Sequence, residues 1–166
     1  MLRQTPAGIT LPLPSPLLGM LPPKLQKYPM KAFWLNFPLA ALLAAPASGA
    51  QVNVSAGVNP NFWFAGWYGV ISLRSSDNQT DRSTSPLTAT MTDNDNFQYQ
   101  PQNTTTDIRN FLSTAGTSQP AVWASPLIIP PSGQITLTLQ SLDTVNAVNA
   151  RVTFVGVLIQ APANLP

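Results

Sequence analysis

The sequence predicts an all-β protein, an antiparallel β-sandwich preceded by a long extended arm. From Gln51 onward, short runs rich in β-branched and aromatic residues alternate with the Asn, Asp, Ser, Gly and Pro clusters that are typical of turns. No helical periodicity of useful length accompanies them. Residues 1–50 differ: they contain nine prolines, four basic residues and no acidic one. We therefore divide the chain into an arm, residues 1–50, and a sandwich domain, residues 51–166.

The arm combines prolines with many large apolar side chains. Proline removes backbone donors and is excluded from helix interiors and central strands, so we expect an extended segment, with polyproline II over Leu11–Pro16 and a helical turn or two over Leu39–Ala45. Its apolar side chains would be unfavourable in water, so the arm needs a surface to lie on. Its candidate partner-binding residues are the apolar Leu11, Leu13, Leu17, Leu18, Leu21, Phe33, Trp34, Leu35 and Phe37 and the basic Arg3, Lys24, Lys27 and Lys31.

Part of the arm also has the order of a secretory signal. Met30 and Lys31 precede an apolar run, Ala32–Ala45, and small residues stand before Gln51. The run is shorter than the ~20 residues of a membrane-spanning helix and contains Pro38, so a membrane anchor is not favoured. Secretion with residues 1–50 as a leader remains an alternative.

The strands of the sandwich follow in order. Ile135–Leu142 alternates, which points Ile135, Leu137 and Leu139 inward, and Arg151–Ile159 is apolar on both faces, as in a central strand. Pro130–Gly133 is a turn in which Gly133 is free to take a positive φ. Short strands at this spacing predict a jelly-roll-like sandwich. The expected strands are Gln51–Ser55, Phe62–Leu73, Leu87–Thr92, Phe97–Gln100, Ile108–Leu112, Ala121–Ile129, Gln134–Leu142 and Arg151–Ile159.

The run Phe62–Gly69 holds five aromatic residues in eight positions. Such a cluster could stack sugars or bases. We favour a core strand, because aromatic residues are usually buried, with glycines that let another backbone approach. Either Trp63 or Trp67 is then expected to face outward beneath the arm.

The chain has no His, Glu or Cys. Catalytic triads, Cys–His pairs and His-based zinc sites are therefore excluded. Lys occurs only in the arm, so only Asp and Tyr remain for acid–base chemistry in the sandwich domain. Asp93 and Asp95 resemble the start of a calcium loop, but the loop lacks its glycine and its final Glu, and a turn explains the same residues. We expect no enzyme activity, catalytic residue, cofactor or small-molecule substrate.

A resemblance is carried by the C-terminal pattern. The apolar stretch Trp123–Pro130 is followed by a Pro-Ser-Gly turn, the strand Ile135–Leu142, a polar turn with Asn146 and Asn149, and Arg151–Ile159. Over roughly residues 60–160 this pattern resembles small jelly-roll structural proteins of tailed bacteriophage virions, a class that includes head decoration and cement proteins. Phe62–Leu73 resembles their first long strand.

The resemblance implies a non-enzymatic structural protein at the capsid surface of a virion. Such a capsid decoration protein would bind the major capsid protein or other virion subunits, self-associate as an oligomer, and tie its neighbours together through the arm. Two alternatives stay open: a neck, tail or fibre-attachment protein, and a secreted or periplasmic β-sandwich binding module. The four basic residues of the arm are not clustered, so nucleic acid is not favoured as a partner, and neither is a membrane.

Overall fold

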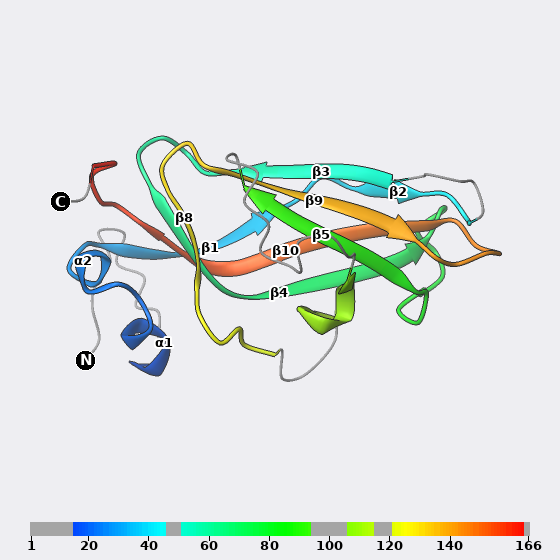
Figure 1. Ribbon diagram of the computed structural model, residues 1–166, viewed down its shortest axis with the longest axis horizontal. Helices are drawn as coiled ribbons and strands as arrows, with labels where there is room; N and C mark the ends of the chain where they lie inside the picture. The colour runs from blue at the N-terminus through cyan, green and yellow to red at the C-terminus, as the bar shows by residue number, and fades with distance from the viewer. Residues whose placement is uncertain (1–14, 46–50, 94–105, 115–120, 165–166) are drawn as a thin grey trace.

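The computed structural model describes residues 15–45, 51–93, 106–114 and 121–164, and they form an all-β sandwich of two sheets (Figure 1). The all-β sandwich that the sequence predicts is therefore confirmed. The elements are α1 (Ser15–Gly19), α2 (Pro23–Gln26), β1 (Met30–Asn36), β2 (Ala40–Leu42), β3 (Gln51–Gly57), β4 (Trp63–Ser75), β5 (Leu87–Asp93), β6 (Thr106–Asp107), the 3₁₀ turn η1 (Ile108–Asn110), β7 (Leu112–Thr114), β8 (Leu127–Ile129), β9 (Gln134–Ser141) and β10 (Val148–Ile159).

Within the described ranges, one sheet has six strands and the other has four. The larger sheet has the order β1-β10-β4-β7, with β2 also paired to β10 and β8 also paired to β4. The smaller sheet has the order β3-β9-β5-β6. The prediction of a central strand is confirmed, because β10 has neighbours on both sides and is buried along most of its length.

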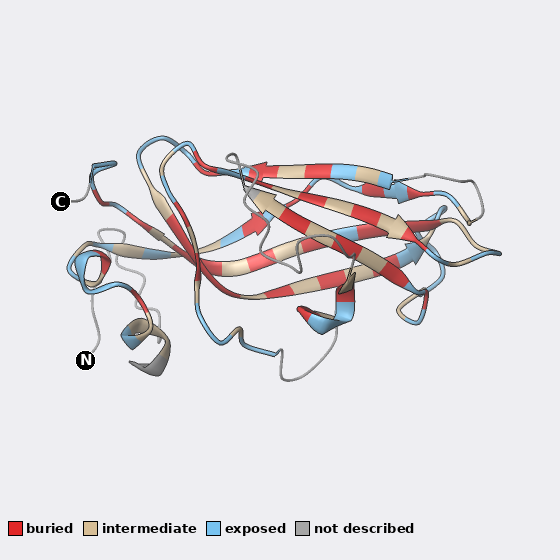
Figure 2. Ribbon diagram, viewed as in Figure 1, coloured by how far each residue is buried: buried red, intermediate tan, exposed pale blue. Residues whose placement is uncertain are grey.

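The main core lies between the two sheets. Buried residues alternate with less buried ones along the central strands (Figure 2). Ile135, Leu137 and Leu139 of β9 are fully buried, as their alternation predicts. Across from them the larger sheet contributes aromatic rings in edge-to-face contacts, with 4.9 Å between the centroids of Phe37 and Phe154. Such contacts add specific geometry to the burial of apolar area.

The expected boundary between an arm and the sandwich at residue 50 is wrong. β1 and β2 both pair with β10 in the larger sheet, and Leu35 and Phe37 belong to the main core. The helical turns expected over Leu39–Ala45 are replaced by strand β2. Prolines did not exclude these residues from a sheet, because Pro29 and Pro38 lie outside the two ends of β1, where a missing donor removes no hydrogen bond from within the strand. Residues 1–14, with Leu11–Pro14 of the expected polyproline stretch, lie outside the described residues.

Two expected strands are shorter than predicted. Ile108–Leu112 begins as the 3₁₀ turn η1 and reaches strand geometry only at Leu112, and Ala121–Ile129 is a strand only over β8. Asp107 explains the first difference, because its carboxylate accepts a hydrogen bond from the Arg109 amide and caps the turn. The expected strand Phe97–Gln100 lies outside the described residues.

The turn between β8 and β9 uses its glycine differently from the prediction. The positive φ, 62°, belongs to Ser132. Gly133 is instead required for space, because a Cβ there would lie 2.6 Å from Cγ2 of Ile129 and 2.8 Å from the carbonyl oxygen of Pro130. The glycine thus serves a close approach between the ends of the turn.

Candidate functional site: the outer face of the six-stranded sheet

A β-bulge in β4 determines which side chains lie on the outer face of the larger sheet. Tyr68 lies opposite Val155, while Gly66 lies opposite Gly156, so Trp67 is an extra residue without a partner in β10. A Cβ on Gly156 would collide with the carbonyl group of Ala65, which explains the glycine at the bulge. The bulge lets Trp67 pack on the outer face.

The residues of α1 and α2, with the turn that follows them, cover this tryptophan; we call residues 17–28 the helical cover. Leu21 and Leu25 are each 2% exposed and form a second apolar cluster with Trp67 and with Val157 of β10. The indole N–H of Trp67 donates a hydrogen bond of 3.1 Å to the carbonyl oxygen of Leu17. The prediction that a tryptophan faces outward beneath the N-terminal residues is confirmed for Trp67.

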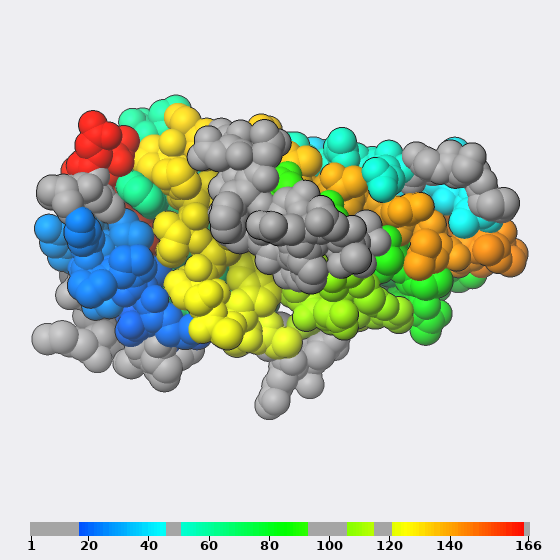
Figure 3. Space-filling model, in the orientation of Figure 1, coloured from blue at the N-terminus to red at the C-terminus, as the bar shows by residue number. Residues whose placement is uncertain are grey.

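The helical cover also contacts the chain on the far side of β4. Ile128 of β8 packs against the second cluster, and the cover and the segment 121–130 lie side by side on one face of the molecule (Figure 3). The backbone N–H of Trp123 donates to the carbonyl oxygen of Trp67 at 2.8 Å, between the short ladders that β8 and β7 form with β4. This edge of the larger sheet is therefore paired over much of its length.

Beyond the helical cover, no described helix or strand lies over the outer face of the larger sheet. Trp34 of β1, Val155 of β10 and Tyr68 of β4 lie in register across three strands, and we call these three residues the Trp34 row. Trp34 is 58% exposed, against 2% for Trp67, and the other two residues are half-buried. An exposed tryptophan beside further apolar side chains is typical of a contact surface.

Polar residues continue the outer face beyond the Trp34 row. The Thr153 hydroxyl donates to the side-chain oxygen of Asn36 at 2.8 Å, and Arg151 is exposed. None of the residues of β1, β4 and β10 is acidic. This face can therefore offer apolar contact and neutral hydrogen bonds, with a weak positive charge.

A second group of exposed apolar side chains lies where β2 and the β9–β10 turn meet. Leu43 is 61% exposed, and Leu142 and Val145 are 48% and 81% exposed. The Ala45 amide donates to the carbonyl oxygen of Asp143 at 2.7 Å and holds the two segments together. We call this group the apolar tip.

The described carboxylates are used in turns. Asp77, Asp81, Asp107 and Asp143 each accept a hydrogen bond from the backbone N–H two residues later. The amides of Val145 and Asn146 and the hydroxyl of Ser85 lower the pKa of Asp143 from 3.8 to about 2. Hydrogen bonds from Ser75 and from Arg109 lower the pKa values of Asp77 and Asp107, respectively. These shifts stabilise the ionised carboxylates and suit structural caps better than proton transfer at neutral pH.

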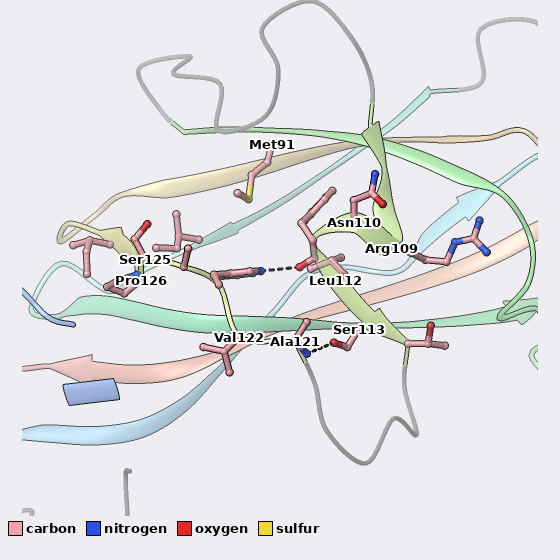
Figure 4. A pocket seen from close by; sticks show the side chains of 15 residues that line it. Met91, Arg109, Asn110, Leu112, Ser113, Ala121, Val122, Ser125 and Pro126 are labelled. Carbon is pink, nitrogen blue, oxygen red and sulfur yellow. Dashed lines mark hydrogen bonds between the residues drawn. The ribbon is translucent and has the colours of Figure 1, made fainter. Parts of the chain in front are cut away.

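A pocket of about 880 Å³ opens beside β7 and the segment 121–128 (Figure 4). Met91 and Trp123 supply apolar lining, and the indole N–H of Trp123 donates to the carbonyl oxygen of Phe111 at 2.7 Å. Among the described lining residues, Arg109 carries the one charge, and its guanidinium is paired with Asp107 at 2.8 Å. Thr114 and Ala121, which stand on either side of the undescribed residues 115–120, also line the pocket.

The predicted partner-binding residues divide into four groups. Trp34, Lys24, Lys27 and Lys31 are exposed; Leu17, Leu18 and Phe33 are half-buried; Leu21, Leu35 and Phe37 are buried; Arg3, Leu11 and Leu13 lie outside the described residues. For Leu21, Leu35 and Phe37 the prediction of partner contact is wrong, because the chain buries them in its own two cores. The sequence analysis did not identify Val155, Tyr68 or the apolar tip. The pattern of a strand shows which residues share a face, but it does not show which face the rest of the chain leaves uncovered.

Of the two candidate metal residues, Asp93 ends β5, with its side chain outside the described part of the chain, and Asp95 lies outside the described residues. Elsewhere in the described chain, no three His, Cys, Asp or Glu side chains gather closely enough to hold a metal ion. No described helix has the length and apolar character needed to cross a membrane. No protein-family model matches the chain, and no curated protein matches it at a significant level.

Proposed function

We propose that this chain is a non-enzymatic structural protein of a virion, a capsid decoration or cement protein that binds other virion subunits through the exposed part of its larger sheet. The strand order carries the proposal. β1 pairs with β10, β3 with β9, β4 with β8, and β5 with β6, all antiparallel. When β1 and β2, which both pair with β10, are counted as one strand, the first strand pairs with the last, the second, β3, pairs with the last but one, and the nesting continues inward to β5 and β6; β7, which lies parallel to β4, stands outside this order. Such nested pairing supports a jelly roll, an architecture frequent in viral capsid proteins.

The surface chemistry supports a role in assembly. Three exposed large apolar residues, Trp34, Leu39 and Leu43, belong to β1 or stand beside β2. The four described carboxylates serve as turn caps, and the chain contains no His, Glu or Cys to act as a base or nucleophile. A protein with this surface gains free energy by covering apolar side chains with another chain.

The geometry changes how the N-terminal residues would act. β1 and β2 are fixed in the sandwich, so from residue 30 onward they cannot extend across neighbouring subunits as a free arm. In our proposal they hold neighbours through a rigid face, with the Trp34 row as the contact. A rigid face loses little conformational entropy on binding, which favours repeated contacts on a symmetric shell.

The test is co-purification with particles followed by localisation. Particles assembled with the full chain and with the variant Trp34→Lys would be separated on a density gradient, and the bound chain would be measured by quantitative mass spectrometry. We expect the full chain on the particle surface in many copies and a strong loss with Trp34→Lys. An exposed substitution in the loop between β4 and β5, Thr84→Lys, is the control and should bind normally. A handful of copies at one vertex would support a neck or tail role instead, and absence from the particle fraction would contradict the proposal.

A further inference from the structure

β1 is an edge strand whose second side has no partner among the described strands. The Phe37 amide donates to the carbonyl oxygen of Val152 at 3.0 Å, which sets the hydrogen-bonding phase of the edge. Because hydrogen-bonded residues alternate along an antiparallel ladder, Phe33 and Leu35 direct their backbone groups toward β10. Ala32 and Trp34, with Met30 and Asn36 on either side of them, direct theirs away from the sheet.

We propose that β1 pairs antiparallel with β1 of a second copy of this chain, about a two-fold axis at Phe33, and so joins two six-stranded sheets into one. In this register Trp34 lies opposite Ala32 of the second copy, and Met30 lies opposite Asn36. These four residues are the ones whose backbone groups point outward, so the new ladder would contain about eight hydrogen bonds. The inference does not depend on the virion assignment.

Side-chain size favours this register. Trp34 is 58% exposed on the outer face, and its neighbour across the axis would be Ala32, a small residue on the same face. A large ring over a small side chain fills the space between paired strands without a clash. The same contact occurs twice, once on each side of the axis, as a two-fold interface requires.

The charge of β1 and the prolines outside its two ends also favour this register. Lys31, the only charged residue of β1, would lie opposite Leu35, so no like charges meet. Pro29 and Pro38 limit the strand that can pair, and the register centred on Phe33 uses all seven residues between Met30 and Asn36. A register centred on Ala32 or on Trp34 would leave two residues unpaired, and the latter would set the two Trp34 rings opposite each other.

The position of the exposed surface also favours a second copy of this chain as the partner. The Trp34 row ends at the β1 edge, so pairing would set this row beside Ala32 of the second copy and bring the second copy's own Trp34 row onto the same face, offset by two residues along the strand. The opposite edge of the larger sheet already carries β7, β8 and the Trp123 amide. Among the described strands of this sheet, β1 is therefore the longest one with an open side.

Sedimentation velocity over a range of concentrations tests the pairing. We expect a monomer–dimer equilibrium for the full chain, and a rise in the dimer Kd of more than about tenfold for Trp34→Lys, because a central aromatic contact is lost. Leu142→Lys, at the apolar tip, is the matched control and should leave the Kd unchanged. A full chain that stays monomeric at all concentrations, or a dimer that is indifferent to Trp34→Lys, would overturn the proposal.

Disulfide trapping then tests the register, and the chain has no cysteine of its own to interfere. Met30→Cys and Asn36→Cys chains would be mixed and oxidised. Paired residues have Cα atoms about 5.5 Å apart, within the range of a disulfide. We expect a crosslinked dimer from the mixture and none from either variant alone. Crosslinking within a single variant, or none in a mixture that sediments as a dimer, would reject the register.

Discussion

Trp67 and Trp34 lie on the same outer face of the same sheet, yet their surroundings are opposite. Trp67 is 2% exposed beneath the helical cover, and its indole N–H is hydrogen-bonded to Leu17. Trp34 is 58% exposed, two strands away, with no described residue above it that would bury it. The difference comes from where residues 17–28 lie, since they cover one half of the face and leave the other half open.

The comparison teaches that the N-terminal region performs two tasks. Its first part closes a hydrophobic surface that the β4 bulge creates, and its second part, β1 and β2, completes the larger sheet. A tryptophan that the chain covers itself contributes to the stability of the fold. A tryptophan that it leaves open is available for a partner. The experiments below should separate these two contributions.

The largest effect is expected from removal of residues 1–50. This truncation deletes β1, β2 and the helical cover, exposes one side of β10, and removes Leu35, Phe37, Ala40 and Leu42 from the core. We expect a chain without a cooperative unfolding transition, measured by circular dichroism during heating. The chain that begins at Ser15 is the control and should unfold cooperatively. A truncated chain from Gln51 that melts cooperatively near the temperature of the full chain would show that the N-terminal region is dispensable.

The next effect is a direct contrast of the two tryptophans. Trp67→Ala should lower the free energy of unfolding by about 3–5 kcal/mol, since it opens a cavity beneath the helical cover. Trp34→Ala should change it by less than about 0.5 kcal/mol in the dilute monomer, because the side chain is exposed. Urea denaturation of both variants measures the contrast. Similar losses for the two variants would mean that Trp34 is covered in the native protein.

How far sequence reasoning reaches differs between these regions. The clean alternation of β9 predicts a strand with one buried face, and the apolar run of β10 predicts a central strand, because each pattern is set by the strand's own two faces. β1 was not predicted as a strand, because the prolines near it indicate an extended arm, although they lie outside the ends of the strand. The burial of β1 depends on its pairing with β10, more than a hundred residues away. The local sequence pattern of β1 cannot predict that pairing.

The candidate site shows the same limit. The aromatic run Phe62–Gly69 can be predicted to hold both core and outward-facing rings, but its bulge depends on the pairing of Gly156 with Gly66. The sequence marks Trp34, Leu35 and Phe37 as equally apolar. Only the register of β1 against β10 separates the exposed ring from its two buried neighbours.

The smallest effect is expected from acid, at a turn remote from both tryptophans. The folded-state pKa of Asp143 is lowered to about 2, so the ionised carboxylate stabilises the fold above its unfolded pKa near 3.8, and this contribution is lost as the pH falls from about 4 toward 2. Asp143→Asn should lower the Tm modestly at pH 7 and converge with the unmodified chain near pH 2. A Tm difference that stays constant between pH 7 and pH 2 would contradict this account of the turn.

The central claim is that residues 30–36 form an integral edge strand with one side open. Residue-resolved amide hydrogen exchange at low and high protein concentration tests it most directly. We expect the amides of Phe33 and Leu35 to be protected at both concentrations, and those of Ala32 and Trp34 to exchange rapidly when dilute and slowly when concentrated. Rapid exchange of all four amides would show that β1 is not part of the sheet, and protection of Ala32 and Trp34 already at low concentration would show that its outer side is not open.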